Sequence, residues 1–137
     1  MSAPGLEQAL LDALDDERKA EAAYDSVIER FGPVRPFINI VEAEARHSAA
    51  VERQMRRLGV PVPPNPWPGR VQAPASLKAA CAAAIEGEIE NIAMYDRLLE
   101  NIADGDVRQT FLNLRSASHD NHLPAFRRCL ARETGRG

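Results

Sequence analysis

The sequence predicts an all-α protein, an antiparallel four-helix bundle with a long proline-rich crossover between its second and third helices. Apolar residues recur at alternating three- and four-residue steps in four segments, which run over about 6–31, 35–58, 75–103 and 106–132. Short polar breaks separate the outer pairs of segments, whereas a run of prolines separates the middle two. Alanine is abundant and aromatic residues make up only 5% of the chain, as closely packed helices require. With 137 residues, the chain (1–137) is predicted to be a single domain.

Composition and charge narrow the range of partners. The net charge of −3 offers no basic surface for nucleic acid, and no apolar run approaches the roughly 20 residues that span a bilayer. The first residues have neither the basic end nor the apolar core of a secretory signal. We therefore expect no nucleic-acid partner, no membrane partner and a cytoplasmic location, or a secreted or periplasmic one if a signal segment has been trimmed.

The first predicted helix, 6–31, carries two carboxylates where a bundle helix should be apolar. Its inner stripe consists of Leu10, Leu14, Glu17, Glu21, Tyr24, Ile28 and Phe31. Gly32 and Pro33 end this helix, and the link to the next helix is short. The second helix is therefore expected to lie antiparallel beside the first.

The second predicted helix, 35–58, places Glu44 and His47 on its apolar stripe. The apolar members of that stripe are Phe37, Ile40, Val51, Met55 and Leu58. A buried carboxylate is strongly unfavourable unless it is paired or bound to a cation. Side chains three residues apart on a helix project side by side, so a Glu-x-x-His pair can hold one metal ion. A surface ion pair is the alternative interpretation of such a pair on its own.

Residues 60–74 are predicted to cross the full height of the bundle. Five prolines within nine residues cannot continue a helix and favour an extended, polyproline-like path. At about 3.1 Å per residue, such a segment reaches roughly 45 Å, more than the length of a helix of about 25 residues. The third helix can therefore begin at the end of the bundle where the second one begins. A flexible linker is the alternative, but each half alone would be one hairpin, too small to stand by itself.

The third and fourth predicted helices carry the remaining candidates. The stripe of the third helix consists of Leu77, Cys81, Ile85, Glu88, Ile92, Tyr95, Leu99 and Ile102. Asp104 to Asp106 break the chain and supply an N-cap. The inner side of the fourth helix consists of Val107, Phe111, Leu114, Ser118, His122, Phe126 and Cys129. Pro124 leaves the carbonyl of Asp120 without its helical N–H partner, so we expect a kink or bulge near His122.

The two predicted hairpins match each other by role. The matched pairs, each seven residues apart, are Glu17 and Tyr24 with Glu88 and Tyr95, and Phe37 and Glu44 with Phe111 and Ser118. His47 is matched by His122 after a slip of one residue. Inward carboxylates on two helices, with Glu-x-x-His on the other two, are the arrangement of ferritin-like di-iron and di-manganese proteins. Polar residues paired across a bundle core are the alternative.

At these residues the chain resembles the ferritin-like superfamily. Glu17-x-x-Ala20-x-x-x-Tyr24 and Phe37-x-x-Ile40-x-x-x-Glu44-x-x-His47 look like the first two helices of rubrerythrins. The chain is most similar to a family of uncharacterised bacterial ferritin-like domains, whose ending resembles Asn121-His122-Leu123-Pro124-Ala125-Phe126. The resemblance covers about 6–130. It implies a ferritin-like bundle with a carboxylate-bridged dinuclear iron site.

The resemblance also implies roles for single residues. Glu17 would be a terminal ligand, Glu44 and Glu88 bridging or terminal ligands, and His47 and His122 would each bind one metal. Two iron ions are expected, with manganese or zinc as the alternatives, because imidazole with carboxylate suits all three metals.

The fourth helix departs from the superfamily pattern. A glutamate is expected three residues before His122, where His119 stands, whereas alignment on the phenylalanines puts Ser118 at that place instead. His119 either replaces the carboxylate or points aside, which leaves an open position or a weak second metal.

Asp120 would supply the missing oxygen only if the kink at Pro124 turned it inward, and Glu21 only if the first helix shifted. Tyr24 and Tyr95 either hydrogen-bond the metal-binding carboxylates without binding the metals themselves, or are ordinary core residues.

The two cysteines are predicted to meet one layer away from the metals. Cys81 lies seven residues before Glu88 and Cys129 lies seven after His122, on antiparallel helices. Two helical turns span about 10.5 Å in each case, so both cysteines reach the same level. A Cys81–Cys129 disulfide or a buried thiol pair follows, and a disulfide would favour an oxidising compartment.

The function that these features predict is that of an oxidoreductase. A dinuclear iron centre would react with oxygen or peroxide, as a ferroxidase or a peroxide reductase. The chain has no Cys-x-x-Cys pair of the rubredoxin kind, so the electron donor would be external, and we expect a homodimer. The alternative is a non-catalytic bundle with a degenerate or mononuclear site that serves as a binding or assembly module.

Overall fold

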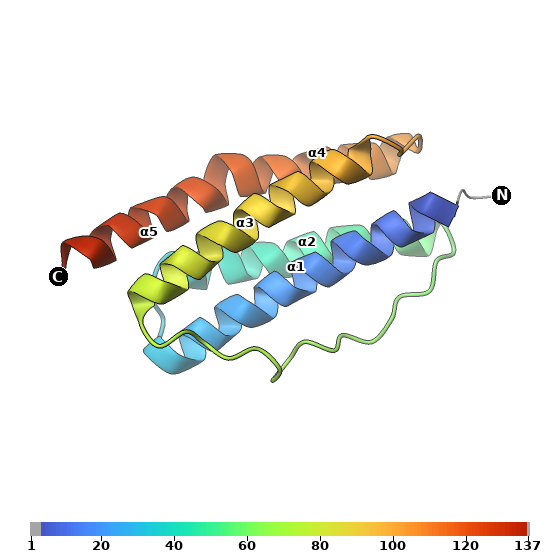
Figure 1. Cartoon of the computed structure of the whole chain (residues 1–137). Helices are drawn as coiled ribbons and strands as arrows, with labels where there is room; N and C mark the ends of the chain where they lie inside the picture. Colours follow the sequence, from blue (N-terminus) through green and yellow to red (C-terminus); the bar gives the residue numbers. More distant parts are fainter. Residues whose placement is uncertain (1–3, 137) are drawn as a thin grey trace.

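The computed structural model describes residues 4–136, which form four helices packed antiparallel with a long loop, 58–76, between the second and the third (Figure 1). The helices are α1 (Pro4–Phe31), α2 (Phe37–Arg57), α3 (Leu77–Leu99) and a composite fourth rod made of α4 (Gly105–Ala117), η1 (Ser118–His122) and α5 (Leu123–Gly135). The predicted all-α fold class is confirmed. Within the described residues, no helix has the length and apolar character needed to cross a membrane.

Helix ends follow from local chemistry, and the largest difference from expectation is at the end of the third helix. Ser76 caps α3 by accepting a hydrogen bond from the N–H of Ala79 at 3.0 Å, and Asp104 caps α4 in the same way with Val107 at 3.0 Å. The third helix was expected to continue to 103 but ends at Leu99. The chain after Leu99 turns inward and buries Ile102 in the core instead.

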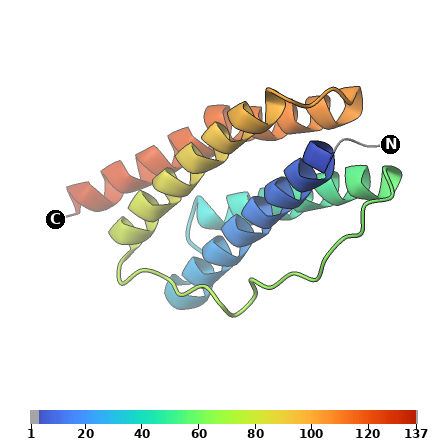
Figure 2. The same cartoon turned by 45° about the vertical axis from the view of Figure 1, so that its right-hand side comes forward.

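The crossover runs along α1 over the height of the bundle, as the proline count predicts (Figures 1 and 2). Arg18 donates a hydrogen bond from Nη1 to the carbonyl of Pro63 at 2.9 Å, and the indole N–H of Trp67 donates to Asp15 at 2.9 Å. Lys19 lies 5.7 Å from the centre of the Trp67 ring. These contacts all come from α1, so the crossover is fastened to that helix.

The core is divided into two apolar clusters. The upper cluster, near the start of α1, includes Leu10, Leu14, Val51, Met55, Tyr95, Val107 and Phe111. The lower cluster includes Tyr24, Val27, Phe37, Ile40, Cys81, Phe126 and Cys129. Between them lies a polar layer, defined here as Glu17, Glu44, His47, Glu88, Asn91, Ser118 and His122. The candidate site therefore sits at mid-height, closed above and below by apolar side chains.

The inner face of α3 is turned relative to the predicted stripe. Ala84 and Asn91 are buried, whereas Ile85 and Ile92, which were expected inside, are only half-buried. Both sets keep the spacing of Cys81, Glu88 and Tyr95, so periodicity alone cannot choose between them. Apolar character favoured the isoleucines, but the interior uses the hydrogen-bonding capacity of Asn91.

The predicted irregularity of the fourth rod is a single π-helical turn, Ser118–His122. Pro124 has no N–H to donate to the carbonyl of Asp120, and a π turn takes up one extra residue within an otherwise helical rod. Ser118 and His122 face the interior, and the residues between them face solvent. Below this turn, the structure joins Cys81 of α3 to Cys129 of α5 by a disulfide, with Cα atoms 5.8 Å apart.

Candidate metal centre

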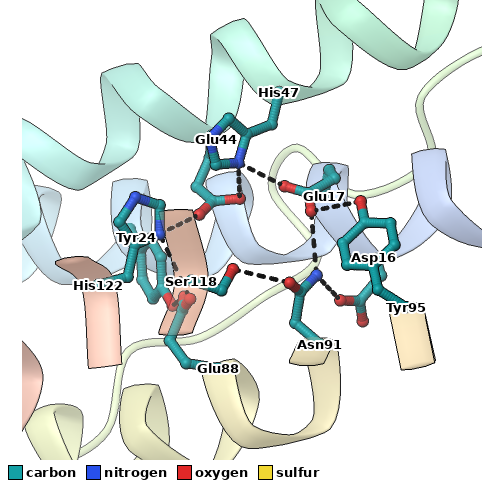
Figure 3. A network of polar contacts seen from close by, with 10 residues as sticks. All are labelled: Asp16, Glu17, Tyr24, Glu44, His47, Glu88, Asn91, Tyr95, Ser118 and His122. Carbon is teal, nitrogen blue, oxygen red and sulfur yellow. Dashed lines mark hydrogen bonds and ion pairs between the residues drawn. The ribbon is translucent and has the colours of Figure 1, made fainter. Parts of the chain in front are cut away.

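The polar layer brings together five of the predicted metal ligands from all four rods (Figure 3). They form two groups, Glu17 with Glu44 and His47, and Glu44 with Glu88 and His122. In each group, one ligand atom per residue lies within 4.8 Å of the others. Glu44 belongs to both groups, so two overlapping buried triads share one carboxylate and could hold two metal ions.

The two oxygens of Glu44 face different histidines. His47 Nδ1 lies 3.8 Å from Oε2 of Glu44 and 3.1 Å from Oε2 of Glu17. His122 Nδ1 lies 3.1 Å from Oε1 of Glu44 and 3.3 Å from Oε1 of Glu88. The two imidazole rings stack with their centres 5.3 Å apart. A carboxylate with one oxygen toward each triad is the arrangement that a bridging ligand needs.

Two ligand atoms of the second triad are buried without a hydrogen-bond partner among the described residues. These atoms are Glu88 Oε1 and His122 Nδ1, which face each other at an angle that does not support a hydrogen bond. Leaving a buried polar atom unsatisfied costs roughly 1–3 kcal/mol, so native interiors rarely do so without a reason. A cation would satisfy both atoms at once, and the residues therefore fit a metal.

The carboxylates do not share charge equally. Burial raises the pKa of Glu44 well above its usual range, and the negative charge of Glu17 raises it further. Burial would also raise the pKa of Glu17, but hydrogen bonds with His47 and Glu44 outweigh burial and lower that pKa to about 2. Burial and the charge of Glu17 therefore favour the protonated form of Glu44, and a cation that binds there competes with that proton.

The two tyrosines cross between α1 and α3. Tyr24 of α1 donates its hydroxyl to Oε2 of Glu88, and Tyr95 of α3 donates to Oε1 of Glu17 at 2.8 Å. Burial, more than any neighbouring charge, raises the pKa of both hydroxyls, so both remain protonated donors. Each tyrosine orients the carboxylate of the opposite hairpin, beyond filling core space.

Asn91 joins several residues of the layer, although no role was predicted for it from the sequence. Its Nδ2 donates to Oδ2 of Asp16 at 2.7 Å and to Oε1 of Glu17 at 3.0 Å, and its Oδ1 accepts from Ser118 at 2.8 Å. Burial raises the pKa of Asp16 to about 6, although the Asn91 bond opposes that rise. A signal was present, because Asn91 follows Glu88 by three residues and so shares its face of the helix.

His119 and Glu21 lie outside the two triads. The His119 side chain is 57% exposed and its Nδ1 lies 2.8 Å from Asp120, which is exposed as well. The π turn causes this placement, because it points Ser118 and His122 inward and the residues between them outward. Glu21 is half-buried beside the crossover, where it lines a hollow with Arg18 and Asn65. Of His119, Asp120 and His122, the candidate ligands on the fourth rod, only His122 reaches the layer.

The fold and the site together define a class of protein, an all-helical bundle with a buried carboxylate–histidine cluster at mid-height. No protein-family model matches the chain, and no curated protein matches its sequence. Among solved structures, the chain is similar to the crystal structure of hypothetical protein MJ0754 from Methanococcus jannaschii DSM 2661, with a TM-score of 0.88. The match covers 98% of this chain and 84% of that one at 20% sequence identity, and it establishes the fold alone.

Proposed function

We propose that the polar layer binds two iron ions and that the protein is a ferritin-like oxidoreductase. The observation that carries this proposal is the position of Glu44, whose two oxygens serve two buried triads. Glu17 and His47 would complete one metal site, and Glu88 and His122 the other. The unsatisfied atoms of Glu88 and His122 support a cation in the second site.

Two irons held by these residues would supply reactivity toward oxygen or hydrogen peroxide, as in a ferroxidase or a peroxide reductase. The chain itself fixes the ligands and limits the access of water. Tyr24 and Tyr95 hold the outer oxygens of Glu88 and Glu17, and Asn91 holds Glu17 from a second direction. The apolar clusters above and below keep the layer in a medium of low polarity, where these contacts are stronger than in water.

The reductant and the assembly complete this proposal. Both cysteines of the chain are joined in the disulfide, which leaves no thiolate ligand for a second redox centre in the chain. Electrons would therefore come from an external donor. The disulfide favours an oxidising compartment. We also propose a homodimer.

A second candidate function rests on Ser118. This residue occupies the place at which the sequence comparison of the hairpins requires a fourth carboxylate. Three carboxylates leave two divalent ions with an excess of positive charge, which favours a single bound metal. A bundle with one zinc or manganese ion would then be a non-catalytic binding or assembly module.

Metal content separates the two functions. The protein is purified without chelator, loaded anaerobically with Fe(II), and analysed for metal per chain. We expect about two irons per chain, with oxygen and peroxide consumption by the loaded protein. Glu44→Ala and His47→Ala should remove bound iron, whereas the matched control His119→Ala, on the exposed side of the same rod as His122, should keep it. One metal per chain or none, without oxygen reactivity, would refute the dinuclear centre and favour the module.

A further inference from the structure

A cavity of about 480 Å³, open to solvent on one side, lies between α1 and α3, beside and below the polar layer. Six of its lining residues are alanine or glycine, namely Ala20 and Ala23 of α1 and Ala80, Ala83, Ala84 and Gly87 of α3. Cavities of a few hundred Å³ with largely apolar walls are the usual size and character of sites for small organic molecules. The residues of the proposed metal centre do not need this space.

The cavity is a consequence of how the two helices are held apart. The bonds from Tyr24 to Glu88 and from Tyr95 to Glu17 bridge α1 and α3 at the level of the polar layer. Alanine and glycine side chains are too short to fill the gap that remains. The end of the crossover closes one side, where Val71 and Pro74 line the cavity.

Two residues that line the cavity also form hydrogen bonds with the polar layer. The Tyr24 side chain lines the cavity and donates its hydroxyl to Glu88. Asp16 lines it as well and accepts a hydrogen bond from Asn91, which also binds Glu17. A molecule in the cavity would therefore be separated from Glu88 by Tyr24, and from Glu17 by Asp16 and Asn91.

The charged residues at the cavity are mainly acidic. Asp16 of α1 and Glu86 and Glu90 of α3 line it, against one basic residue, Lys19. The ammonium group of Lys19 lies over the Trp67 ring of the crossover. Three carboxylates opposed by one cation favour a positively charged ligand group, and the apolar walls favour a hydrocarbon body.

We propose that this cavity binds a small organic ammonium ion with an apolar body, its charged group beside Asp16, Glu86 and Glu90. The site needs no metal for binding, so it can be tested apart from the proposed function. In the metal-loaded protein, the same site would place an amine as a substrate or effector next to Tyr24.

Gly87 offers a variant that fills the cavity without disturbing the fold. A Cβ added at Gly87 meets no atom within 4 Å, and the position lies inside α3. Gly87→Leu should therefore occupy the cavity while raising helix propensity, and Gly87→Ala raises helix propensity without filling it. Ala23→Leu, on the opposite wall, is a second blocking variant that does not depend on Gly87.

The test is calorimetric titration of the metal-free protein with hexylammonium, hexanoate and hexan-1-ol. We expect hexylammonium to bind best, Gly87→Ala to bind it as the unaltered protein does, and both leucine variants to bind it at least about tenfold more weakly. Asp16→Asn should weaken the binding of hexylammonium and leave the binding of hexan-1-ol unchanged. Circular dichroism verifies that each variant is helical.

Three results would overturn the proposal. The first is no binding of hexylammonium by the unaltered protein at millimolar concentration. The second is equal binding of the ammonium, the carboxylate and the alcohol, which would show that the acidic residues do not select a positive charge. The third is undiminished binding in both helical leucine variants, which would place the ligand elsewhere. None of these results depends on whether the polar layer binds iron.

Discussion

The two hairpins of this bundle, α1 with α2 and α3 with the fourth rod, use one plan with different residues. Each first helix carries a buried glutamate and, seven residues later, a tyrosine that bonds the glutamate of the other hairpin. Each second rod carries a histidine whose Nδ1 faces the shared carboxylate. The polar layer is therefore nearly symmetric in its outer oxygens and in its imidazoles.

Within the polar layer, the hairpins differ mainly at one pair of positions. The first has Ala20 and Glu44, and the second has Asn91 and Ser118 at the matching places. In the second hairpin, Asn91 replaces the small Ala20 and Ser118 replaces the large Glu44. The Ser118 hydroxyl donates a hydrogen bond to Asn91 at 2.8 Å. The second hairpin thus gives up a ligand carboxylate and gains a hydrogen-bonded support for Glu17. Two pairs of side chains of similar total size can therefore either bind a metal or hold a neighbouring ligand in place.

The largest expected effect separates Glu44 from its counterpart Ser118. Glu44→Gln keeps the size of the side chain but removes the charge shared by both triads, so we expect both metals to be lost. Ser118→Ala removes only a hydroxyl that bonds Asn91, and both metals should remain. Elemental analysis after Fe(II) loading measures both variants. Equal metal content in the two would show that the hairpins do not differ at the centre.

The next effect concerns the disulfide, which one hairpin has and the other lacks. The first hairpin has Leu10 at the place that corresponds to Cys81. Because the link joins positions 48 residues apart, opening it should lower the free energy of unfolding by about 4 kcal/mol. Urea unfolding with and without reductant measures this change. A Cys81→Ala/Cys129→Ala variant is the control, and its stability should not respond to reductant.

A smaller effect tests whether the second hairpin can be converted to the first. Ser118→Glu alone puts a further carboxylate against Asn91 in a buried layer, and should destabilise the metal-free protein by about 3 kcal/mol. Adding Asn91→Ala makes room for that carboxylate. The double variant should then bind Mn(II) at least about tenfold more tightly than the unaltered chain in calorimetric titrations. Weaker binding would mean that Asn91 contributes more than a fourth ligand does.

The smallest effect distinguishes the two tyrosines. Tyr24→Phe leaves Glu88 with no hydrogen-bond donor from the described residues, because its other oxygen is already unsatisfied, and should destabilise by about 2 kcal/mol. Tyr95→Phe should be milder, about 1 kcal/mol, because Asn91 still donates to the same oxygen of Glu17. Thermal unfolding of the metal-free variants compares them. The reverse order would contradict the assigned donors.

The fold and most of the layer could be predicted from the sequence because buried charge is so unfavourable. Glu17, Glu44 and Glu88 interrupt apolar stripes, and that interruption is visible without coordinates. The crossover was predictable because prolines allow few other paths, and the match between hairpins indicated which histidines face inward.

Asn91 and Asp16 were not predictable in the same way. A neutral amide next to a stripe gives no energetic signal until its partners are known, and Asp16 lies beside Glu17 rather than on the stripe. The position of His119 was left open because it depends on whether the extra residue of the fourth rod is taken up by a bend or by a wide turn. Only the backbone resolves that choice, and it selects the π turn.

That turn determines the phase of everything that follows it. Each residue of an α-helix rotates the chain by about 100°, so one surplus residue would swing Phe126 and Cys129 away from the core. By holding the surplus residue in one wide turn, η1 keeps α5 in phase with α4. Deleting one residue from 119–121 should therefore leave both flanking helices in phase. It would also reduce the four-residue interval from Ser118 to His122 to the three-residue interval of Glu44 and His47.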